Sequence, residues 1–438
     1  MEVKPELELA IGSVISVIHD PRHGNHLMHK AHDMLFAAIV SVVCGFDSYR
    51  FFVKFTELNL KWFRDHGCQF ENGVPSRDAF RNLFSKLDPA LLSACLRSIA
   101  DRLRNKGAFE FVSIDGKAAK RGRNHGEKIP FIVNAWSDAH GIVLGEVKVD
   151  DKSNEITAVP KLMELLDLGG CIVTIDAMGC QKKIAAKIIV EKKADYILAL
   201  KDNQKTFHEE MRFLFESEMD GVNQHLFKKS ETIVEKHHGR IEKRTCYQTD
   251  YIGWFQDVKE WIGLKSVIMI VAERTVRNVE TGKWETSTEK RLYISSLPVD
   301  PELALKAIRA HWGIENRLHW TLDVVFGEDY CRARTKHAAE NRATVRRIAM
   351  NLLNRYGKTH RCGTKHARFR TNPSLEALEE RRCGRDATKP TCNSLSVRGD
   401  RHAHPPALSF RGRSPPDDTS IGTENWGLPA CTLAHLHT

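Results

Sequence analysis

The sequence predicts an α/β protein in which a small helical domain precedes a mixed β-sheet, with a β-rich insertion in the later part of the sheet domain. Three observations predict this fold class. Apolar residues before position 105 recur at helical spacing, the period changes to that of strands near position 109, and two apolar runs each end in an aspartate. With 438 residues, the chain is long enough for two or three domains.

The helical N-terminal domain is predicted to span residues 1–105. The run 31–45 is apolar, contains helix-forming residues and ends at a glycine suited to a C-terminal cap. Ser76 and the pair Asp88-Pro89 are predicted to begin two further helices, because serine and aspartate cap N-termini and proline fits the first turn. A helical domain can place a helix in a DNA groove, but no recognition helix is marked here, so packing is the favoured role.

The sheet domain is predicted to span residues 106–356. Three meandering strands are expected at 109–115, 129–138 and 141–149, and the segment from Asp138 to Gly141 suits a hairpin turn between the last two. Two later strands, ending at Asp176 and Leu200, alternate with helical stretches and are therefore expected to be parallel. Three antiparallel strands continued by two parallel ones form the order of the ribonuclease H-like fold.

The second half of the sheet domain is less regular. Short β-like segments predict a β-rich insertion at about 217–299. A helix is expected to begin at Asp300 and to run toward Phe326, and 329–356 is predicted to be a basic helical stretch. Residues 357–438 are rich in proline and show no sustained period, which predicts an atypical, disordered tail after an abrupt change of character.

Composition limits the classes of function. The net charge of +10 is compatible with a nucleic-acid partner. The 11 cysteines form no C-x-x-C pair, which favours buried free thiols over disulfides or a zinc ribbon. No run approaches the roughly 18 consecutive apolar residues of a membrane helix, and the N-terminus lacks the pattern of a signal peptide. We therefore expect a soluble, cytoplasmic protein without a membrane partner.

Three carboxylates are the candidate catalytic residues. Asp115 and Asp176 each end an apolar strand, where an ionised side chain is costly to bury without a partner. Glu315 falls on the inward apolar stripe of the helix after Asp300, and the residues of that stripe are Ala304, Ile308, His311, Glu315, Leu318 and Leu322. Each alone is more often a turn or cap residue. Together they could bind two divalent cations, Mg²⁺ or Mn²⁺, for in-line phosphoryl transfer.

Five segments in this order resemble the ISAs1 family of bacterial insertion-sequence transposases, also called H-repeat-associated DDE transposases. They are Val112-Ser-Ile-Asp115-Gly-Lys117, Thr174-Ile-Asp176-Ala-Met-Gly-Cys-Gln181, Leu198-Ala-Leu-Lys201-Asp-Asn-Gln204, His238-Gly-Arg240-Ile-Glu242 and Trp312-Gly-Ile-Glu315-Asn-Arg-Leu-His-Trp320-Thr-Leu-Asp-Val. The resemblance covers about residues 10–356. It implies a ribonuclease H-like catalytic domain in which Asp115, Asp176 and Glu315 hold two metal ions, and a homo-oligomer that binds terminal inverted repeats and target DNA.

Two features depart from the related enzymes. Those enzymes carry a Tyr, an Arg and a Lys around the catalytic Glu, whereas this helix has Ile308, His311 and Leu322 at the corresponding spacings. The C-terminal region beyond Tyr356 is not recognisable as the family's ending. The alternative function is therefore a catalytically inactive DNA-binding remnant of a transposase.

Six residues near these motifs are candidate DNA contacts: Lys117, Lys201, Gln204, His238, Arg240 and Arg317. A solvated surface is the competing interpretation for most of them. Trp312 and Trp320 are expected to pack in the core rather than to stack on a base.

Two other classes of enzyme remain open. His311, Glu315 and His319 recur at four-residue spacing, which could indicate a zinc hydrolase, although no H-E-x-x-H motif occurs and the strand aspartates would then have no role. A sequence-independent nuclease of the same fold would share the three carboxylates and differ only in its substrate.

Overall fold

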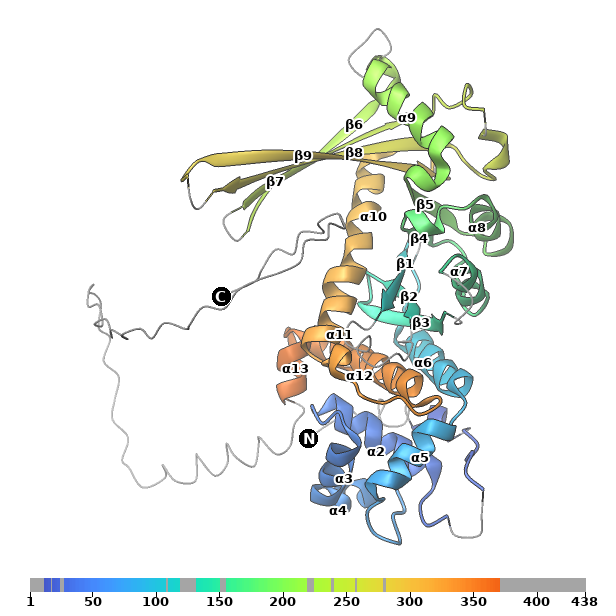
Figure 1. The fold of residues 1–438 in the computed structure, drawn as a ribbon, viewed down its shortest axis with the longest axis vertical. Coiled ribbons are helices and arrows are strands. Elements are labelled where there is room, and N and C mark those ends of the chain that lie inside the picture. The colour runs from blue at the N-terminus through green and yellow to red at the C-terminus, as the bar shows by residue number, and fades with distance from the viewer. Residues whose placement is uncertain are drawn as a thin grey trace, which may run out of the picture. The chain divides into compact units, whose positions relative to one another are not determined.

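The computed structural model describes residues 12–370, except for 17, 24–26, 108, 119–130, 150–154, 219–223, 238–239, 257 and 279–280. The described strands form one mixed sheet in the order β3-β2-β1-β4-β5-β9-β8-β7-β6 (Figure 1). Their bounds are β1 (Phe111–Ala118), β2 (Phe131–Ser137), β3 (Ile142–Lys148), β4 (Ile172–Ile175), β5 (Asp195–Leu200), β6 (Lys228–His237), β7 (Arg240–Thr249), β8 (Ser266–Arg277) and β9 (Trp284–Ser295). None of the helices in the described ranges is long and apolar enough to cross a membrane.

The first five strands have the arrangement that the sequence predicts. Strand β2 pairs antiparallel with both β1 and β3, and the parallel strands β4 and β5 continue the sheet on the other side of β1. The apolar runs at β4 and β5 are buried along almost their whole length, as expected for parallel strands covered on both faces. The carboxyl ends of β1, β4 and β5 therefore meet at one edge of the sheet.

The insertion continues this sheet instead of forming separate short pieces. Strands β6 to β9 are 10 to 12 residues long and form an antiparallel meander. Strand β9 also pairs antiparallel with β5, so the inserted strands share one hydrogen-bonded sheet with the first five. Sequence patterns predicted only a fragment of β9 because the first half of this strand is polar and exposed on both faces.

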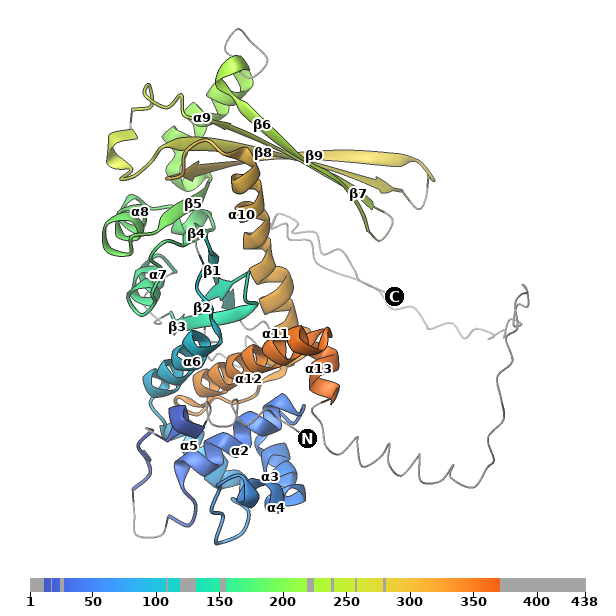
Figure 2. The ribbon, with the colours of Figure 1, turned by 180° about the vertical axis from the view of Figure 1, so that it is seen from behind.

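Helices cover both faces of the central strands (Figures 1 and 2). Helices α7 (Glu155–Glu164), α8 (Lys182–Ala186) and α9 (Lys205–Glu218) lie on one face, where their apolar side chains share a core with Val112, Ile114, Val173 and Ile175. Helix α10 (Pro301–Gly313) lies on the other face, and Ala304 and Ile308 pack there against Ile172. Asp300 caps this helix by accepting a hydrogen bond from the amide of Leu303, as the sequence predicts.

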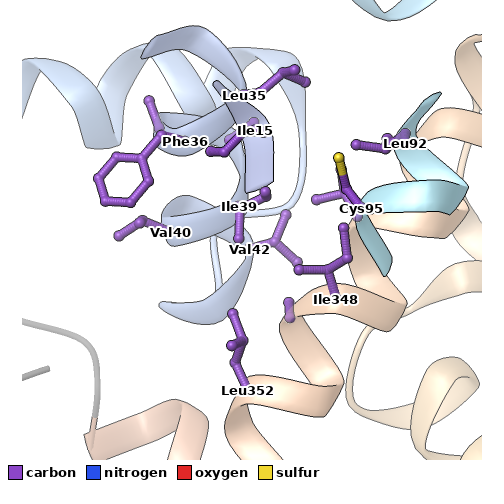
Figure 3. Close-up of a cluster of buried hydrophobic side chains, with 14 of the residues drawn as sticks. Ile15, Leu35, Phe36, Ile39, Val40, Val42, Leu92, Cys95, Ile348 and Leu352 are labelled. Carbon is purple, nitrogen blue, oxygen red and sulfur yellow. The ribbon is translucent and has the colours of Figure 1, made fainter. Parts of the chain in front are cut away.

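The N-terminal helices are α2 (Ala31–Val43), α3 (Tyr49–Leu58), α4 (Leu60–Asp65), α5 (Arg77–Lys86) and α6 (Pro89–Leu103). The predicted caps are present: Ser76 and Asp88 accept backbone hydrogen bonds at the starts of α5 and α6, and Gly45 has a positive φ of 96° after α2. These helices pack against α12 (Ala338–His360), where Ile348 and Leu352 lie close to α2 (Figure 3). The predicted domain boundary at 105 stays a prediction.

Helix α12 differs from the predicted basic stretch in extent and in role. It begins at Ala338, after a short 3₁₀ turn at Glu328–Tyr330, and three of its arginines are buried. Arg342 and Arg346 both form ion pairs with Asp47, at 2.6 Å each. These three arginines therefore bind other parts of the chain, whereas Arg355 and Lys358 of the same helix lie on the surface.

The C-terminal segment also differs from the prediction of disorder after residue 356. Helix α12 continues to His360, and α13 (Thr364–Arg370) follows it. Ala367 of α13 is fully buried, and the side chain of Arg368 donates to the carbonyl of Val42, so this helix packs on the N-terminal helices. Residues 371–438 lie outside the described residues.

Arg347 provides a test of this buried charge network. Its side chain, 1% exposed, donates to Glu328 at 2.8 Å and to Asn134 at 2.7 Å, and its Nε lies 2.6 Å from Glu146. Arg347→Ala leaves two buried carboxylates without their cation, so we expect the free energy of unfolding to fall by about 3–5 kcal/mol. Urea unfolding measures this loss.

The matched control is Arg355→Ala, because Arg355 is exposed on the same helix and should change stability by less than about 0.5 kcal/mol. Equal losses for the two variants would mean that helix propensity, and not the buried ion pairs, accounts for the effect.

Candidate active site

Asp115 and Asp176 lie beside each other where the parallel pairing of β1 with β4 ends. Asp176 follows β4, as predicted, but β1 does not end at Asp115, because its pairing with β2 continues to Ala118. Strands β1 and β4 are parallel, with Ile114 opposite Ile175, so each aspartate occupies the next position at the same edge. Because side chains alternate along a strand, both aspartates point to the face that α10 covers. Asp115 is mostly buried, with 17% of its side chain exposed.

Helix α10 is fixed on this face by polar contacts as well as by apolar packing. The hydroxyl of Thr174 lies 3.0 Å from Nδ1 of His311 and 3.2 Å from the hydroxyl of Ser113. Glu315 lies one turn beyond His311, within a π-helical turn that spans Ile314–His319. π-Helical turns are uncommon and occur frequently at functional sites.

The exposure of Glu315 corrects the prediction that it lies on the inward stripe. Ile308 packs on the sheet, whereas Leu318 packs on the core formed by the N-terminal helices and α12. Glu315 lies between these two contacts and is exposed. The simple 3/4 spacing missed this change because it assumed one regular helix and one buried face.

Negative charge accumulates at this edge of the sheet. Burial, together with the charges of Asp176, Glu315 and Glu155, raises the pKa of Asp115 from its ordinary 3.8 to about 7, against the hydrogen bond from the Gly116 amide, which lowers it. Burial and the charge of Asp176 also raise the pKa of Glu155. Asp115 therefore interacts electrostatically with Asp176 and Glu315, the other two predicted carboxylates, and with a fourth carboxylate, Glu155.

Glu155 is the carboxylate that sequence reasoning missed. It begins α7 and approaches Asp115 from the opposite face of the sheet: a Cβ added to Gly116 would lie 2.7 Å from its Oε1. The only sequence signal would have been an acidic residue at a helix start, which is common for reasons unrelated to catalysis.

A second set of missed residues positions the turn after Asp176. The side chain of Asn203 donates to the carbonyl of Ala177 at 2.6 Å, and that of Gln204 donates to the carbonyl of Cys180 at 3.1 Å. Gln204 was predicted to contact DNA, but this hydrogen bond gives it a structural role. The turn is tight, since a Cβ on Gly179 would lie 2.2 Å from Ile175.

The two histidines do not support the zinc hydrolase alternative. Burial lowers the pKa of His311 to about 4, and its Nδ1 contacts Thr174. Burial and the charges of Lys117 and Arg347 lower the pKa of His319 to about 3. His319 Nδ1 lies 3.7 Å from Asp115, and both rings are neutral near pH 7. Within the described ranges, no group of three or more His, Cys, Asp or Glu side chains could hold a metal ion in the arrangement seen, and this applies to the carboxylates at the sheet edge as well as to the histidines.

Comparison with known proteins identifies the family. Residues 100–352 match the transposase DDE domain, and residues 13–100 match the domain associated with it. The chain belongs to the DDE transposases. A relative from Escherichia coli O157:H7, named as a transposase, is 35% identical over 88% of this chain and 96% of its own length. An H repeat-associated transposase of E. coli K12 is 36% identical over 77% of this chain and 89% of its own.

These matches confirm the family that the sequence motifs resemble, and they show a DNA transposase of the H-repeat-associated kind. They favour this function over the DNA-binding remnant. A solved synaptic complex of piggyBac transposase with hairpin DNA is 12% identical and covers 88% of this chain and 80% of that chain, with a TM-score of 0.40. At that score the likeness carries no argument about the site.

The predicted DNA contacts of the transposase have different environments. Lys117 is buried and forms an ion pair with Asp323 at 2.6 Å, so its ammonium is engaged within the chain. Lys201 is exposed just after β5, at the same edge as the aspartates. Arg317 is 61% exposed and contacts Asp138 at 3.1 Å.

The predicted contacts in the insertion lie elsewhere on the sheet. Arg240 is half-exposed on β7 and forms an ion pair with Glu242 at 3.0 Å. His238 lies outside the described residues. Trp312 and Trp320 are 37% and 49% exposed, which corrects the prediction that they pack in the core. The guanidinium of Arg291 covers the Trp312 ring at 4.4 Å.

The chemistry of the donors fits a divalent cation. All the acidic groups at this edge are carboxylates, which are the ligands that Mg²⁺ and Mn²⁺ prefer. Burial and, after it, three neighbouring negative charges raise the pKa of Asp115, and a bound cation would offset the repulsion between those charges. DDE transposases depend on divalent metal ions, and this donor set agrees with that requirement.

The repulsion at Asp115 predicts a dependence of stability on pH. A carboxyl whose pKa is raised in the folded state binds a proton more tightly there than in the unfolded chain, so stability is lost as pH rises from about 4 to about 7. In chelator, Asp115→Asn should therefore be more stable than the wild type at pH 8, by at most about 4 kcal/mol. Urea unfolding between pH 5.5 and pH 8 measures this.

Asp65→Asn is the control, since Asp65 is exposed on α4. If the Asp115→Asn and wild-type curves stay parallel over this range, the carboxylates do not repel one another as the structure indicates.

Proposed function

We propose that this transposase cuts and joins DNA at the ends of an insertion sequence, and that Asp115, Asp176 and Glu315 hold two Mg²⁺ or Mn²⁺ ions for phosphoryl transfer. The main support is the convergence of these carboxylates from two parallel strand ends and one distant helix in a chain that matches the transposase DDE domain. The strand arrangement supports the further proposal that the catalytic domain, residues 106–356, is ribonuclease H-like.

The bound ions would activate water or a 3′-hydroxyl and stabilise the charge on the leaving oxygen. The chain's own contribution is positioning. Hydrogen bonding between β1, β4 and α10 fixes the distance between the strand aspartates and the helix that carries Glu315. Asn203 orients the turn after Asp176. Burial keeps His311 and His319 neutral near pH 7, so these two side chains add no positive charge beside the carboxylates.

The partners follow from the chemistry of a transposition reaction. We propose that the substrates are the terminal inverted repeats of the element and a target DNA, and that the protein acts as a dimer or larger assembly because two ends must be held together. Lys201 and Arg317 are the best-placed phosphate contacts, since both are exposed near the candidate site. Arg240 would contact DNA farther away. We also propose that residues 1–105 form a domain that assists DNA binding, and that the enzyme works in the bacterial cytoplasm.

The three carboxylates provide the decisive test. Asp115→Asn, Asp176→Asn or Glu315→Gln should reduce cleavage and strand transfer of repeat-end DNA on the order of 10³-fold or more, because each removes a charged metal ligand. DNA binding measured by gel shift without metal should not decrease. The reaction is followed in Mg²⁺ and in Mn²⁺ with the full chain.

Glu302→Gln is the matched control on α10, because Glu302 is 71% exposed at the other end of that helix. The catalytic assignment is wrong if a triple variant cuts DNA as fast as the wild type. Loss of DNA binding together with cleavage in all three variants would instead indicate a structural role.

Lys201 tests the proposed phosphate contact. Lys201→Ala should weaken binding to all duplex sequences to a similar degree, because phosphate contacts carry no sequence information. The slope of log affinity against log salt concentration should decrease by about 1. Lys61→Ala on α4, where Lys61 is 93% exposed and distant in the chain, is the control. An unchanged slope for Lys201→Ala would exclude the contact.

A further inference from the structure

Among the described residues, Glu155 has no partner that explains its position. Its side chain is half-buried, and no described residue forms a hydrogen bond or an ion pair with its carboxylate. Burying part of a carboxylate without a cation is costly, and burying it beside other acids is more so. Elsewhere in the chain such charges are neutralised, for example Glu328 by Arg347.

The backbone makes room for this carboxylate beside Asp115. A Cβ at position 116 would lie 2.4 Å from the Phe131 ring and 2.7 Å from Oε1 of Glu155, so a larger residue would displace one of them. Glycine at 116 thus lets Glu155 come within contact distance of the backbone next to Asp115. Because side chains alternate, Gly116 faces α7 while Asp115 faces α10. Glu155 therefore reaches the strand end from the face opposite Glu315.

A favourable interaction with the helix dipole is the alternative explanation for an acid at the start of α7. That interaction is weak and requires only a position in the first turn. It does not account for a carboxylate oxygen that lies beside Gly116, next to Asp115, where the charges of Asp115 and Asp176 oppose it. A cation shared by these groups would account for both the position and the missing partner.

We infer that Glu155 is a fourth carboxylate of the divalent-cation site, contributed by α7 in addition to Asp115, Asp176 and Glu315. This inference rests on the proposed function, because it assigns Glu155 to the same metal ions. It implies that acids from both faces of the sheet surround the strand ends, with α10 supplying one and α7 the other. If Glu155 binds the metal ions, position 116 must be glycine, because a larger residue would fill the space beside the Glu155 carboxylate.

The experiment measures Mn²⁺ binding to the full chain, with the free ion quantified by electron paramagnetic resonance, in the absence and presence of a short duplex. Glu155→Gln keeps the size of the side chain and removes its charge, and we expect its dissociation constant for Mn²⁺ to rise at least about 10-fold. Glu155→Asp should restore part of the affinity. Glu164→Gln is the matched control, because Glu164 is 61% exposed at the other end of α7.

Asp115→Asn in the same assay separates the two proposals. If Asp115→Asn weakens Mn²⁺ binding and Glu155→Gln does not, the inference about Glu155 is overturned and the proposed function stands. If neither substitution changes Mn²⁺ binding, the cation does not bind at this edge and the proposed function fails with it. Thermal unfolding in chelator verifies folding: Glu155→Gln should unfold no earlier than the wild type, since it relieves repulsion.

Discussion

The rest of the structure depends on holding like charges together at one edge of the sheet. Asp115 and Asp176 are neighbours because β1 and β4 pair in parallel, and this pairing would cost less free energy with neutral residues at the ends. Packing and hydrogen bonding elsewhere must offset that cost. The Thr174–His311 contact and the apolar contacts of α10 with β4 contribute part of this compensating stabilisation. Stability is thus given up locally at a site whose chemistry requires unpaired negative charge.

The treatment of other buried acids in the same chain makes this contrast clear. Asp47 is neutralised by two arginines of α12, and Glu328 by a third. In the described ranges, no lysine or arginine forms an ion pair with the four carboxylates at the strand ends. Lys117, only two residues from Asp115, is engaged by Asp323 instead. Lys117 therefore contributes to the architecture, and the proposed divalent cation would neutralise the carboxylates.

The sequence predicted what local chemistry determines. The end of a strand before Asp176 follows from the apolar pattern, and helix starts at Ser76 and Asp300 follow from capping. The predicted end of β1 at Asp115 was wrong, because pairing with β2 extends that strand to Ala118. Features set by tertiary contacts were not predictable. The arginines of α12 resemble a surface that binds nucleic acid until their buried partners are known, and the role of Glu155 depends on where Gly116 lies in space. The π-helical turn that exposes Glu315 breaks the regular spacing on which its predicted burial depended.

The length of the insertion between β5 and α10 does not determine where α10 begins, because the chain leaves the sheet after β5 and returns to pair with β5 through β9. Strand β9 pairs with β5, and Ser296, just after β9, exchanges hydrogen bonds with Tyr196: its amide donates to the carbonyl at 3.1 Å, and its hydroxyl accepts from the amide at 2.8 Å. The same hydroxyl donates to Asp195. The start of α10 is thereby fixed by β5 itself and not by the length of β6 to β9. This arrangement places Glu315, which is distant in sequence, near Asp115 and Asp176 of the earlier strands.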